Sequence, residues 1–530
     1  MKLASIKVKN FRGFENSDWI PLSNLTAFVG KNDVGKSTVL KAIELVLDSE
    51  ARIVDEDVRR VAGEPVSDMV EIACLFTDVE LPLILDNSEL TTLADECLLT
   101  ASKGLKVSFR YDPHTMKEKI AIQCVTPTLC KDVKVMNLKQ EALRRQVDAL
   151  GLENVNQNSN VDMRRALRES LADGTTELKE LVVGEDIRKD IWERLRDTFP
   201  AFCLFKADRE NTTGDREVQT SIRTAIRLCF DNNGELLEHL KWVSEYTTNV
   251  LQELCAGAIE KIRELDPDLA QTLRPDMPEP QDLKWADVFK NVTLNDESGV
   301  SIDWRGSGVR RVVSLGFLLS NMKLREKQGK TKDVVYAFEE IETAQHSDRQ
   351  RMIVGALNAL SKGVSSQVLL TTHSPYVVQA LDSASIRRVY REGSKTRVKV
   401  VETEFLTFPS LNAVNYHVFG ECCRDYHDEL YGLLTAAKKL TLFEDESRVP
   451  MRDWERNDKV GEAAHEHRSL SYYIRNWIHH PENTLNCEPT LDDIRVSVDC
   501  MFEFAKRHHL LGRRISYPER LTLGVCGDKS

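Results

Sequence analysis

The 530-residue sequence lacks several features that define other classes of protein. No apolar run approaches the roughly 20 residues that a membrane-spanning helix needs, and residues 1–11 lack the apolar core of a signal peptide. No CxxC pair, internal repeat or low-complexity tract is present. We therefore expect a cytoplasmic globular protein that has no membrane partner and whose 12 cysteines are reduced thiols.

The sequence also lacks an excess of positive charge, because 84 Asp and Glu residues outnumber 72 Lys and Arg residues and give a net charge of −12. This excess disfavours sequence-neutral coating of DNA, although a local basic groove can still bind nucleic acid. At roughly 150 residues per domain, the length predicts about three domains.

The most informative stretch joins a short apolar run, residues 25–29, to an amphipathic helix. Between them residues 30–37 read GKNDVGKS, a complete GxxxxGK[ST] phosphate-loop pattern. Its glycines let successive N–H groups point at phosphate oxygens beside a helix N-terminus. We expect an ATP site in which Lys36 bridges the β- and γ-phosphates and Ser37 holds Mg²⁺. The predicted nucleotide-binding residues here are Gly30, Asn32, Gly35, Lys36, Ser37 and Thr38.

Two later apolar runs end in ionisable residues. Residues 334–338 lead into Glu339 and Glu340. We expect Glu339 to hold the metal and Glu340 to act as the general base. Residues 367–372 lead into His373, which can reach a γ-phosphate if the two strands are parallel. Taken alone, the two glutamates would also suit a solvated surface after a strand, and a lone histidine is more often structural. The prediction therefore depends on their combination with the phosphate loop.

In order and spacing, these segments resemble the ABC-type ATPase heads of the SMC/RecF/OLD group. Residues 8–14 (VKNFRGF) resemble the first strand and turn of that group, and residues 339–347 (EEIETAQHS) resemble the OLD family's "EEPE…HP" segment. Residues 371–375 (TTHSP) match its switch-histidine segment. The resemblance covers about residues 1–85 and 290–400, and it departs from the group in lacking a clear Q-loop glutamine near residues 70–80.

The resemblance assigns the signature motif to Ser307 and Gly308, in a Gly-Ser-Gly turn that opens an apolar segment. In that group, the signature motif contacts ATP held by the opposite subunit. The implied partner is therefore a second copy, in a homodimer or higher oligomer closed by an ATP sandwich and opened by hydrolysis.

The same resemblance extends to the ATPase subunits of prokaryotic antiphage systems of the Gabija, Septu and PARIS types. It implies a sensor that regulates a nuclease or toxin, either within the chain or on a partner protein. Two alternatives stay open: a RecF-like DNA-repair ATPase without a nuclease, and an OLD-like nuclease with a degenerate Toprim domain.

The expected fold is α/β: an ABC-type P-loop ATPase head with a helical insertion, followed by a mainly α-helical C-terminal domain. Residues 1–85 and 291–404 are assigned to the two halves of the head, and residues 405–530 to the C-terminal domain. Residues 86–290 are assigned to a compact, helix-rich arm for dimerisation, with helical segments such as residues 177–196 and 234–264.

The C-terminal domain contains a second candidate site. Arg475 and His480 match the Arg-x4-His motif of HEPN domains, which are helical modules that are often RNases. Both residues stand near the end of a predicted helix that Pro481 stops. Because a helix C-terminus favours an imidazolium, His480 would suit a general acid and Arg475 would steady the phosphate. The competing interpretation is a helical platform for a partner, in which the two residues only complement the helix dipole.

Overall fold

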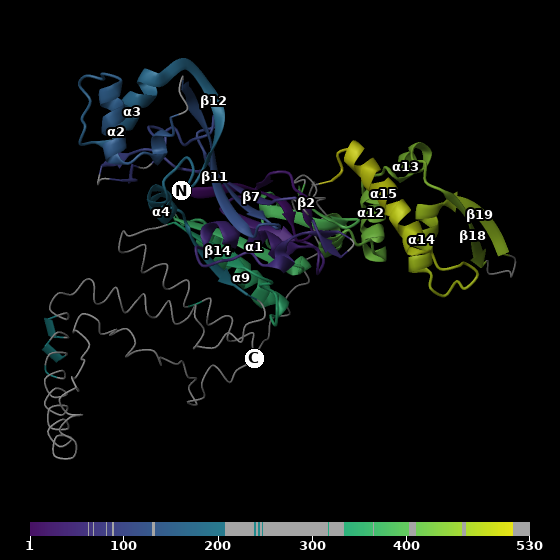
Figure 1. Ribbon diagram of the computed structural model, residues 1–530. Coiled ribbons are helices and arrows are strands. Elements are labelled where there is room, and N and C mark those ends of the chain that lie inside the picture. Colours follow the sequence, from purple (N-terminus) through teal and green to yellow (C-terminus); the bar gives the residue numbers. More distant parts are fainter. Residues whose placement is uncertain are drawn as a thin grey trace. The chain divides into compact units, whose positions relative to one another are not determined.

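The computed structural model describes residues 1–206, 333–401 and 410–511, except for residues 62, 67, 81, 87–88, 130–132, 364 and 458–462, and adds a few single residues between 238 and 316. The chain divides into two compact units, Met1–Leu204 with Lys332–Ser530 and Phe205–Thr331. Almost all described residues belong to the first unit (Figure 1). The predicted signature residues Ser307 and Gly308 and most of the predicted helical arm lie outside the described residues.

The first of two large sheets has six strands in the order β13-β14-β15-β4-β16-β17. Strands β14, β15, β4 and β16 run parallel, and β17 is antiparallel to β16. Every residue of β4, β14 and β15 is buried, as expected for parallel strands covered on both faces. The strands are β4 (Leu25–Val29), β13 (Ala201–Phe205), β14 (Val334–Phe338), β15 (Ser366–Thr372), β16 (Ile386–Glu392) and β17 (Lys395–Val400).

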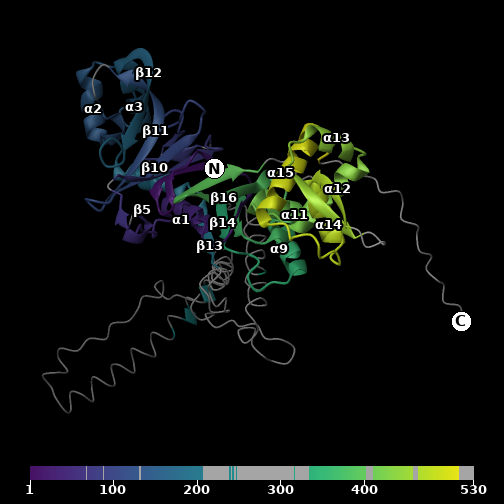
Figure 2. The same cartoon turned by 90° about the vertical axis from the view of Figure 1, so that its right-hand side faces the viewer.

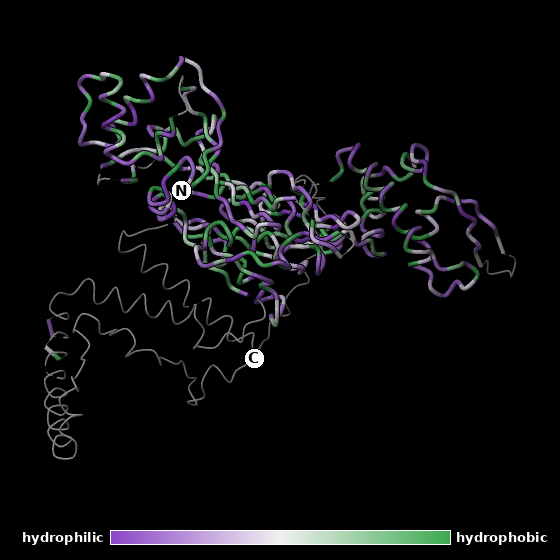
Figure 3. Tube along the Cα trace, viewed as in Figure 1, coloured by the Kyte–Doolittle hydropathy of each residue, from purple (hydrophilic) through white to green (hydrophobic). Residues whose placement is uncertain are grey.

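The second large sheet is antiparallel and has seven strands in the order β12-β11-β10-β7-β1-β2, with β3 also paired to β1. Helix α1 (Lys36–Leu47) contacts β1 and β7 of this sheet and β15 of the parallel sheet, and nine of its 12 residues are buried. The core therefore forms around α1, and Figure 3 shows apolar residues gathered along these central strands. The strands are β1 (Lys2–Phe11), β2 (Phe14–Asn16), β3 (Ile20–Pro21), β7 (Val70–Thr77), β10 (Leu105–Asp112), β11 (Lys117–Leu129) and β12 (Ala172–Val182).

The predicted helix-rich insertion from residue 86 onward is wrong for residues 105–129 and 172–182, because these form three long strands of the antiparallel sheet, whereas residues 140–149 and 160–171 between them are helical as predicted. The helix predicted over residues 177–196 is wrong in its first part, since residues 177–182 belong to β12 and helix α4 (Lys189–Asp197) begins only later. Pairing with β11 over most of its length fixes β12 as a strand despite its polar sequence.

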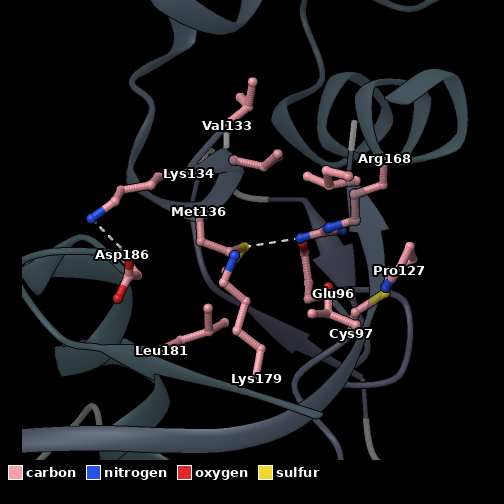
Figure 4. A pocket seen from close by; sticks show the side chains of 13 residues that line it. Glu96, Cys97, Pro127, Val133, Lys134, Met136, Arg168, Lys179, Leu181 and Asp186 are labelled. Carbon is pink, nitrogen blue, oxygen red and sulfur yellow. Dashed lines mark hydrogen bonds and ion pairs between the residues drawn. The ribbon is translucent and has the colours of Figure 1, made fainter. Parts of the chain in front are cut away.

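A helical hairpin lies beside β11 and β12 (Figures 1 and 2) and consists of α2 (Gln140–Ala149) and α3 (Asn160–Leu171). Fully buried Arg164 of α3 donates hydrogen bonds to Asp86 and Glu96, and Arg168 donates to Glu96 at 2.8 Å. A cavity of about 50 Å³ adjoins this network (Figure 4). The polar side chains Glu96 and Arg168 that line this cavity are already hydrogen-bonded to each other, and Arg168 also donates to the Met136 sulfur. We interpret this network as structural.

The C-terminal part of the described chain has its own apolar core and is largely helical, as predicted. It opens with α11 (Leu411–Val414) and a π-helical turn, Asn415–Phe419. Its longer elements are α12 (Arg424–Ala436), α13 (Leu440–Glu446), α14 (Leu470–His479), α15 (Leu491–Arg507) and the antiparallel hairpin of β18 (Met451–Asn457) and β19 (Ala463–Ser469).

Helices α9 (Ser347–Ser361) and α10 (Pro375–Gln379) follow β14 and β15 of the parallel sheet. Short elements fill the connections: the hairpins β5 (Arg60–Val61) with β6 (Glu64–Pro65) and β8 (Leu83–Ile84) with β9 (Leu90–Thr91), and 3₁₀ turns at Asp55–Asp57, Val135–Asn137 and Ser383–Ser385. Within the described chain, no helix combines the length and the apolar character that crossing a membrane requires.

Candidate nucleotide-binding site

The phosphate loop connects β4 to α1, as its sequence predicts. Gly35 caps the helix with a φ of 101°, a left-handed conformation that glycine adopts without strain. At Gly30 a Cβ atom would lie 2.2 Å from the backbone oxygen of Val389, so no larger residue fits beside β16. Both glycines of the motif are therefore required by the local backbone.

Lys36 is almost completely buried at the first position of α1. Its Nζ donates hydrogen bonds to the backbone oxygens of Gly30, at 3.0 Å, and Lys31, at 2.7 Å. Burial lowers the pKa of Lys36, and the nearby carboxylates of Glu340 and Glu342 oppose that shift. The Lys36 ammonium is thus bound to the loop backbone and lies near Glu340 and Glu342. A nucleotide phosphate can replace the two backbone oxygens as its hydrogen-bond acceptor.

The remaining predicted loop residues differ in exposure. Asn32 is exposed, Ser37 is half-buried and Thr38 is buried. Ser37 is therefore partly accessible to solvent, as a side chain that supplies an oxygen ligand to Mg²⁺ must be.

Glu339 and Glu340 follow β14 at the carboxyl edge of the parallel sheet, and both are half-buried. Glu340 has a φ of 46°, and its backbone N–H donates to the buried Thr371 hydroxyl of neighbouring β15 at 3.0 Å. Since β4, β14 and β15 are parallel, their carboxyl ends lie at one edge, and this arrangement brings the acidic pair to the phosphate loop.

His373 follows β15 and is held by Glu342. Its backbone N–H donates to Glu342 Oε1 at 2.6 Å, and its Nδ1 lies 3.0 Å from the same oxygen without the alignment of a hydrogen bond. The Glu340 Oε1 is 3.8 Å from this Nδ1. Glu342 is 6% exposed, and within the described chain its Oε2 has no hydrogen-bond partner. A buried carboxylate thus fixes the histidine next to Glu340.

Glu342 was part of the matched segment in the sequence but had no predicted role. Its position two residues after Glu340, at a strand end, was the available signal. A second set of hydrogen bonds holds the segment that follows His373. Ser374 Oγ donates to Gln350 Oε1 at 2.6 Å, and Gln350 Nε2 donates to the backbone oxygen of Gln345 at 2.9 Å.

Thr396 of β17 is a second residue that sequence reasoning missed. Its hydroxyl donates to the backbone oxygen of Val34 in the phosphate loop at 3.1 Å. A Cβ at Gly13 would lie 2.4 Å from that hydroxyl oxygen, so the turn after β1 also closes on it. No local motif marks Thr396, since its role depends on chain folding over more than 350 residues.

Two residues of the site carry the type of oxygen ligand that Mg²⁺ prefers. The Ser37 hydroxyl and the Glu339 carboxylate are the hard oxygen donors that Mg²⁺ prefers. No cluster of three or more metal-binding His, Cys, Asp or Glu residues exists in the part of the chain that the structure describes. Two protein oxygens with phosphate oxygens and water match the way this ion binds nucleotides.

The C-terminal candidate site differs from its prediction. On α12, Asp428 Oδ1 lies 3.1 Å from Arg475 Nε and 2.8 Å from His479 Nε2. The predicted partner His480 instead faces Glu482, with 3.1 Å between His480 Nδ1 and Glu482 Oε1. The helix α14 ends at His479, so Arg475 and His479, one turn apart, share the carboxylate.

A protein family described as "AAA ATPase domain" matches residues 1–378 of the chain. The match spans both halves of the nucleotide site, and the chain belongs to this family of nucleotide-binding ATPase domains.

Two curated relatives match short stretches. The OLD nuclease of Thermus scotoductus is 56% identical over 45 residues, which are 8% of this chain and 8% of that protein. The endonuclease GajA of Bacillus cereus is 44% identical over 52 residues, 10% of this chain and 9% of that protein. The chain thus matches less than a tenth of the length of either relative.

Solved SMC head domains are also similar. The head of Thermotoga maritima has 12% identity and a TM-score of 0.34, with 76% of this chain and 100% of that chain covered. The head from Pyrococcus furiosus with an extended coiled coil, bound to the C-terminal domain of ScpA, has 13% identity and a TM-score of 0.35, with 75% and 95% covered.

Proposed function

We propose that this protein hydrolyses ATP with Mg²⁺ and that two copies close around the bound nucleotides to control a nuclease. The observation that carries the ATPase proposal is the convergence of Lys36, Glu340 and His373 at one edge of the parallel sheet. These residues come from three separate segments, and the pKa of Lys36 responds to Glu340 across the site. Membership of the ATPase family supports the same conclusion.

Each residue has a specific role in the proposed reaction. Lys36 and the loop N–H groups bind the β- and γ-phosphates. Ser37 and Glu339 would hold Mg²⁺, which neutralises charge on the phosphate oxygens when bound. Glu340 accepts a proton from the water that attacks the γ-phosphorus, the bond to the β-phosphate oxygen breaks, and ADP and phosphate are the products. His373, oriented by Glu342, donates a hydrogen bond to the γ-phosphate.

The dimer proposal rests on the resemblance to ATPase heads that share their sites between subunits. In it, Ser307 and Gly308 of one copy contact the nucleotide held by the loop of the other. ATP then favours the closed dimer and hydrolysis releases it, so the γ-phosphate sets the position of a two-state element. The output is regulation of a nuclease or toxin in antiphage defence, in the C-terminal domain or on a partner.

The first experiment measures ATP turnover and molar mass by light scattering. We expect Lys36→Ala to abolish both turnover and ATP-dependent assembly, while Lys41→Ala on the outer side of α1 retains them. Glu340→Gln is expected to bind ATP and accumulate as a dimer. Retained turnover in Lys36→Ala contradicts the site, and a Glu340→Gln protein that stays monomeric with ATP contradicts the sandwich alone.

The second experiment identifies any nuclease by incubating the protein with tRNA and plasmid, with and without Mg²⁺ and ATP. RNA cleavage that resists EDTA and is lost in His480→Ala or His479→Ala supports a HEPN-like RNase. Mg²⁺-dependent plasmid nicking supports the Toprim alternative, and no cleavage leaves a partner nuclease or a RecF-like role. Within the described residues from 410 onward, the only strands form an antiparallel hairpin, which favours a helical module over Toprim.

A further inference from the structure

A cavity of about 630 Å³ lies where helices α2, α3 and α4 begin. Asn137 and Gly184 form part of its wall, and the other residues of the wall stand at the start of a helix. They are Lys139 and Gln140 of α2, Asn160 of α3, and Arg188, Lys189 and Asp190 of α4. The volume falls in the range of about 300–1,000 Å³ that is typical of small-molecule sites.

The helix starts make this wall suitable for an anion. The first N–H groups of a helix have no partner within the helix, and the helix dipole makes that end partly positive. Lys139 and Arg188 are the cap residues of α2 and α4, and within the described residues neither side chain caps its helix by a hydrogen bond. Arg188 is compensated by two carboxylates, since its Nη2 lies 2.6 Å from Asp190 Oδ2 and 3.8 Å from Asp86 Oδ2. The exposed ammonium groups of Lys139 and Lys189 therefore supply the charge that would attract a phosphate.

Asn160 indicates the second chemical group of the ligand. It is 1% exposed, and its Nδ2 donates to Asp86 Oδ2 at 2.8 Å, which fixes the orientation of the amide. Its Oδ1 is buried and has no hydrogen-bond partner among the residues that the structure describes. A buried acceptor without a donor is unfavourable. Because Asn160 lines the cavity, a ligand hydroxyl bound there can donate the missing hydrogen bond.

We propose that this cavity binds a sugar phosphate. The phosphate contacts Lys139, Lys189 and the first N–H groups of α2 and α4, and a sugar hydroxyl donates to Asn160 Oδ1. Each described residue of the wall is polar or glycine, so the wall offers hydrogen bonds instead of apolar surface for a nucleobase or a lipid chain. The proposal does not depend on the ATPase proposal, because none of these residues belongs to the nucleotide site.

The test is calorimetric titration of the full-length protein with ribose 5-phosphate and with methyl phosphate, a phosphate monoester whose carbon part has no hydroxyl group. We expect ribose 5-phosphate to bind at least about tenfold more tightly, since only its hydroxyls can donate to Asn160. Equal affinities for the two compounds overturn the proposal. Titration with AMP then identifies the source of the sugar phosphate. Binding of AMP about tenfold tighter than that of ribose 5-phosphate assigns it to a nucleotide, and equal or weaker binding assigns it to a free sugar phosphate.

The double variant Lys139→Glu/Lys189→Glu tests the phosphate contacts. We expect it to weaken the binding of ribose 5-phosphate by more than about tenfold, because it reverses both exposed ammonium charges of the wall. The variant should stay folded, since acidic residues are favourable at a helix start. The matched control Lys103→Glu/Lys438→Glu makes the same charge change at two exposed lysines outside the wall and should change affinity by less than about twofold. Equal loss of binding in the two double variants overturns the proposal.

The variant Asn160→Ala tests the hydroxyl contact. It should remove the preference for ribose 5-phosphate and leave the affinity for methyl phosphate within about twofold of wild type. Thermal unfolding shows whether this variant is folded, and if it is not, the comparison of the two compounds on the wild type tests the same contact. A folded Asn160→Ala protein that keeps the full preference overturns the proposal.

The variant Lys36→Ala separates this cavity from the phosphate loop. Binding of ribose 5-phosphate should persist in it, and loss of that binding would place the compound in the loop and overturn the proposal. The absence of binding by both compounds to the wild type also overturns it. Absence of ATP turnover in the wild type contradicts the proposed ATPase instead and leaves the cavity result standing.

Discussion

The buried carboxylate of Glu342 offers the sharpest test of how the site is built. Replacing it with glutamine keeps the size of the side chain and an oxygen that can accept the backbone N–H of His373. It removes the negative charge that lies 3.0 Å from His373 Nδ1 and that also acts on Lys36. The change therefore isolates the charge of Glu342 from its shape.

The expected size of the effect follows from the hydrogen bond that changes. A bond to a charged group contributes about 1.5–3 kcal/mol, and a neutral bond about 0.5–1.5 kcal/mol. The midpoints of these ranges differ by about 1.25 kcal/mol, which corresponds to a fall of roughly eight- to tenfold in kcat for a residue that orients His373 in the transition state. Because no hydrogen bond satisfies Glu342 Oε2 within the described chain, the neutral side chain should leave the free energy of unfolding within about 1 kcal/mol of wild type.

Steady-state ATP hydrolysis and thermal unfolding check these values on the same preparation. We expect kcat of Glu342→Gln to fall about tenfold with little change in KM, since the proposed contact of His373 strengthens only as charge develops on the γ-phosphate. Asp348→Asn, on an exposed acidic residue in the first turn of α9, serves as the control and should behave as wild type. A folded Glu342→Gln protein with kcat within about twofold of wild type would refute the positioning role.

Three further predictions concern stability. Arg164→Met leaves Asp86 and Glu96 buried without their main cation and should lower the free energy of unfolding in urea by about 3 kcal/mol. The control Arg165→Met, at an exposed residue, should lower it by less than about 0.5 kcal/mol. Equal urea midpoints for the two variants would show that the buried ion pairs of Arg164 do not stabilise the fold. Burial lowers the pKa of His427 to about 3, so only the unfolded chain binds this proton between pH 6.5 and 3. The free energy of unfolding should therefore fall by about 2 kcal/mol from pH 7 to pH 5. His427→Gln should reduce this loss, and an equal loss in the variant and the wild type would contradict the role of His427. Gly420→Ala places a Cβ against Arg388 at positive φ and should lower the free energy of unfolding by about 1–2 kcal/mol. Thermal unfolding measures this change, and an unchanged midpoint would contradict it.

The parts of the site that the sequence predicted are those in which local chain geometry determines chemistry. A phosphate loop needs only a strand, two glycines and a helix in immediate succession, and Gly30 to Ser37 contain the whole pattern. Glu340 and His373 were predictable because each directly follows an apolar strand, and parallel strands align their carboxyl ends. The positions of these residues in the fold agree with that reasoning.

The parts that the sequence did not reveal depend on contacts between distant segments. The polar strand β12 contains Glu, Leu and Lys residues with good helix propensity, and only its pairing with β11 makes it a strand. Arg475 was matched to His480 by motif spacing, yet Asp428 on another helix attracts Arg475 and His479 instead. In each case tertiary contacts outweigh a local preference.

Strands β16 and β17 follow residue 378, where the family match stops, and both contact the phosphate-loop region. Strand β16 pairs with β4 and its Val389 oxygen packs against Gly30, while Thr396 of β17 bonds to the phosphate loop. A chain that ends at residue 378 loses both supports and leaves β4 as an unprotected edge strand. We expect such a truncation to be insoluble or unable to bind ATP, and a chain that ends at residue 401 to bind it. Equal solubility and ATP affinity of the two truncations, measured by sedimentation and calorimetry, would show that β16 and β17 do not support the loop.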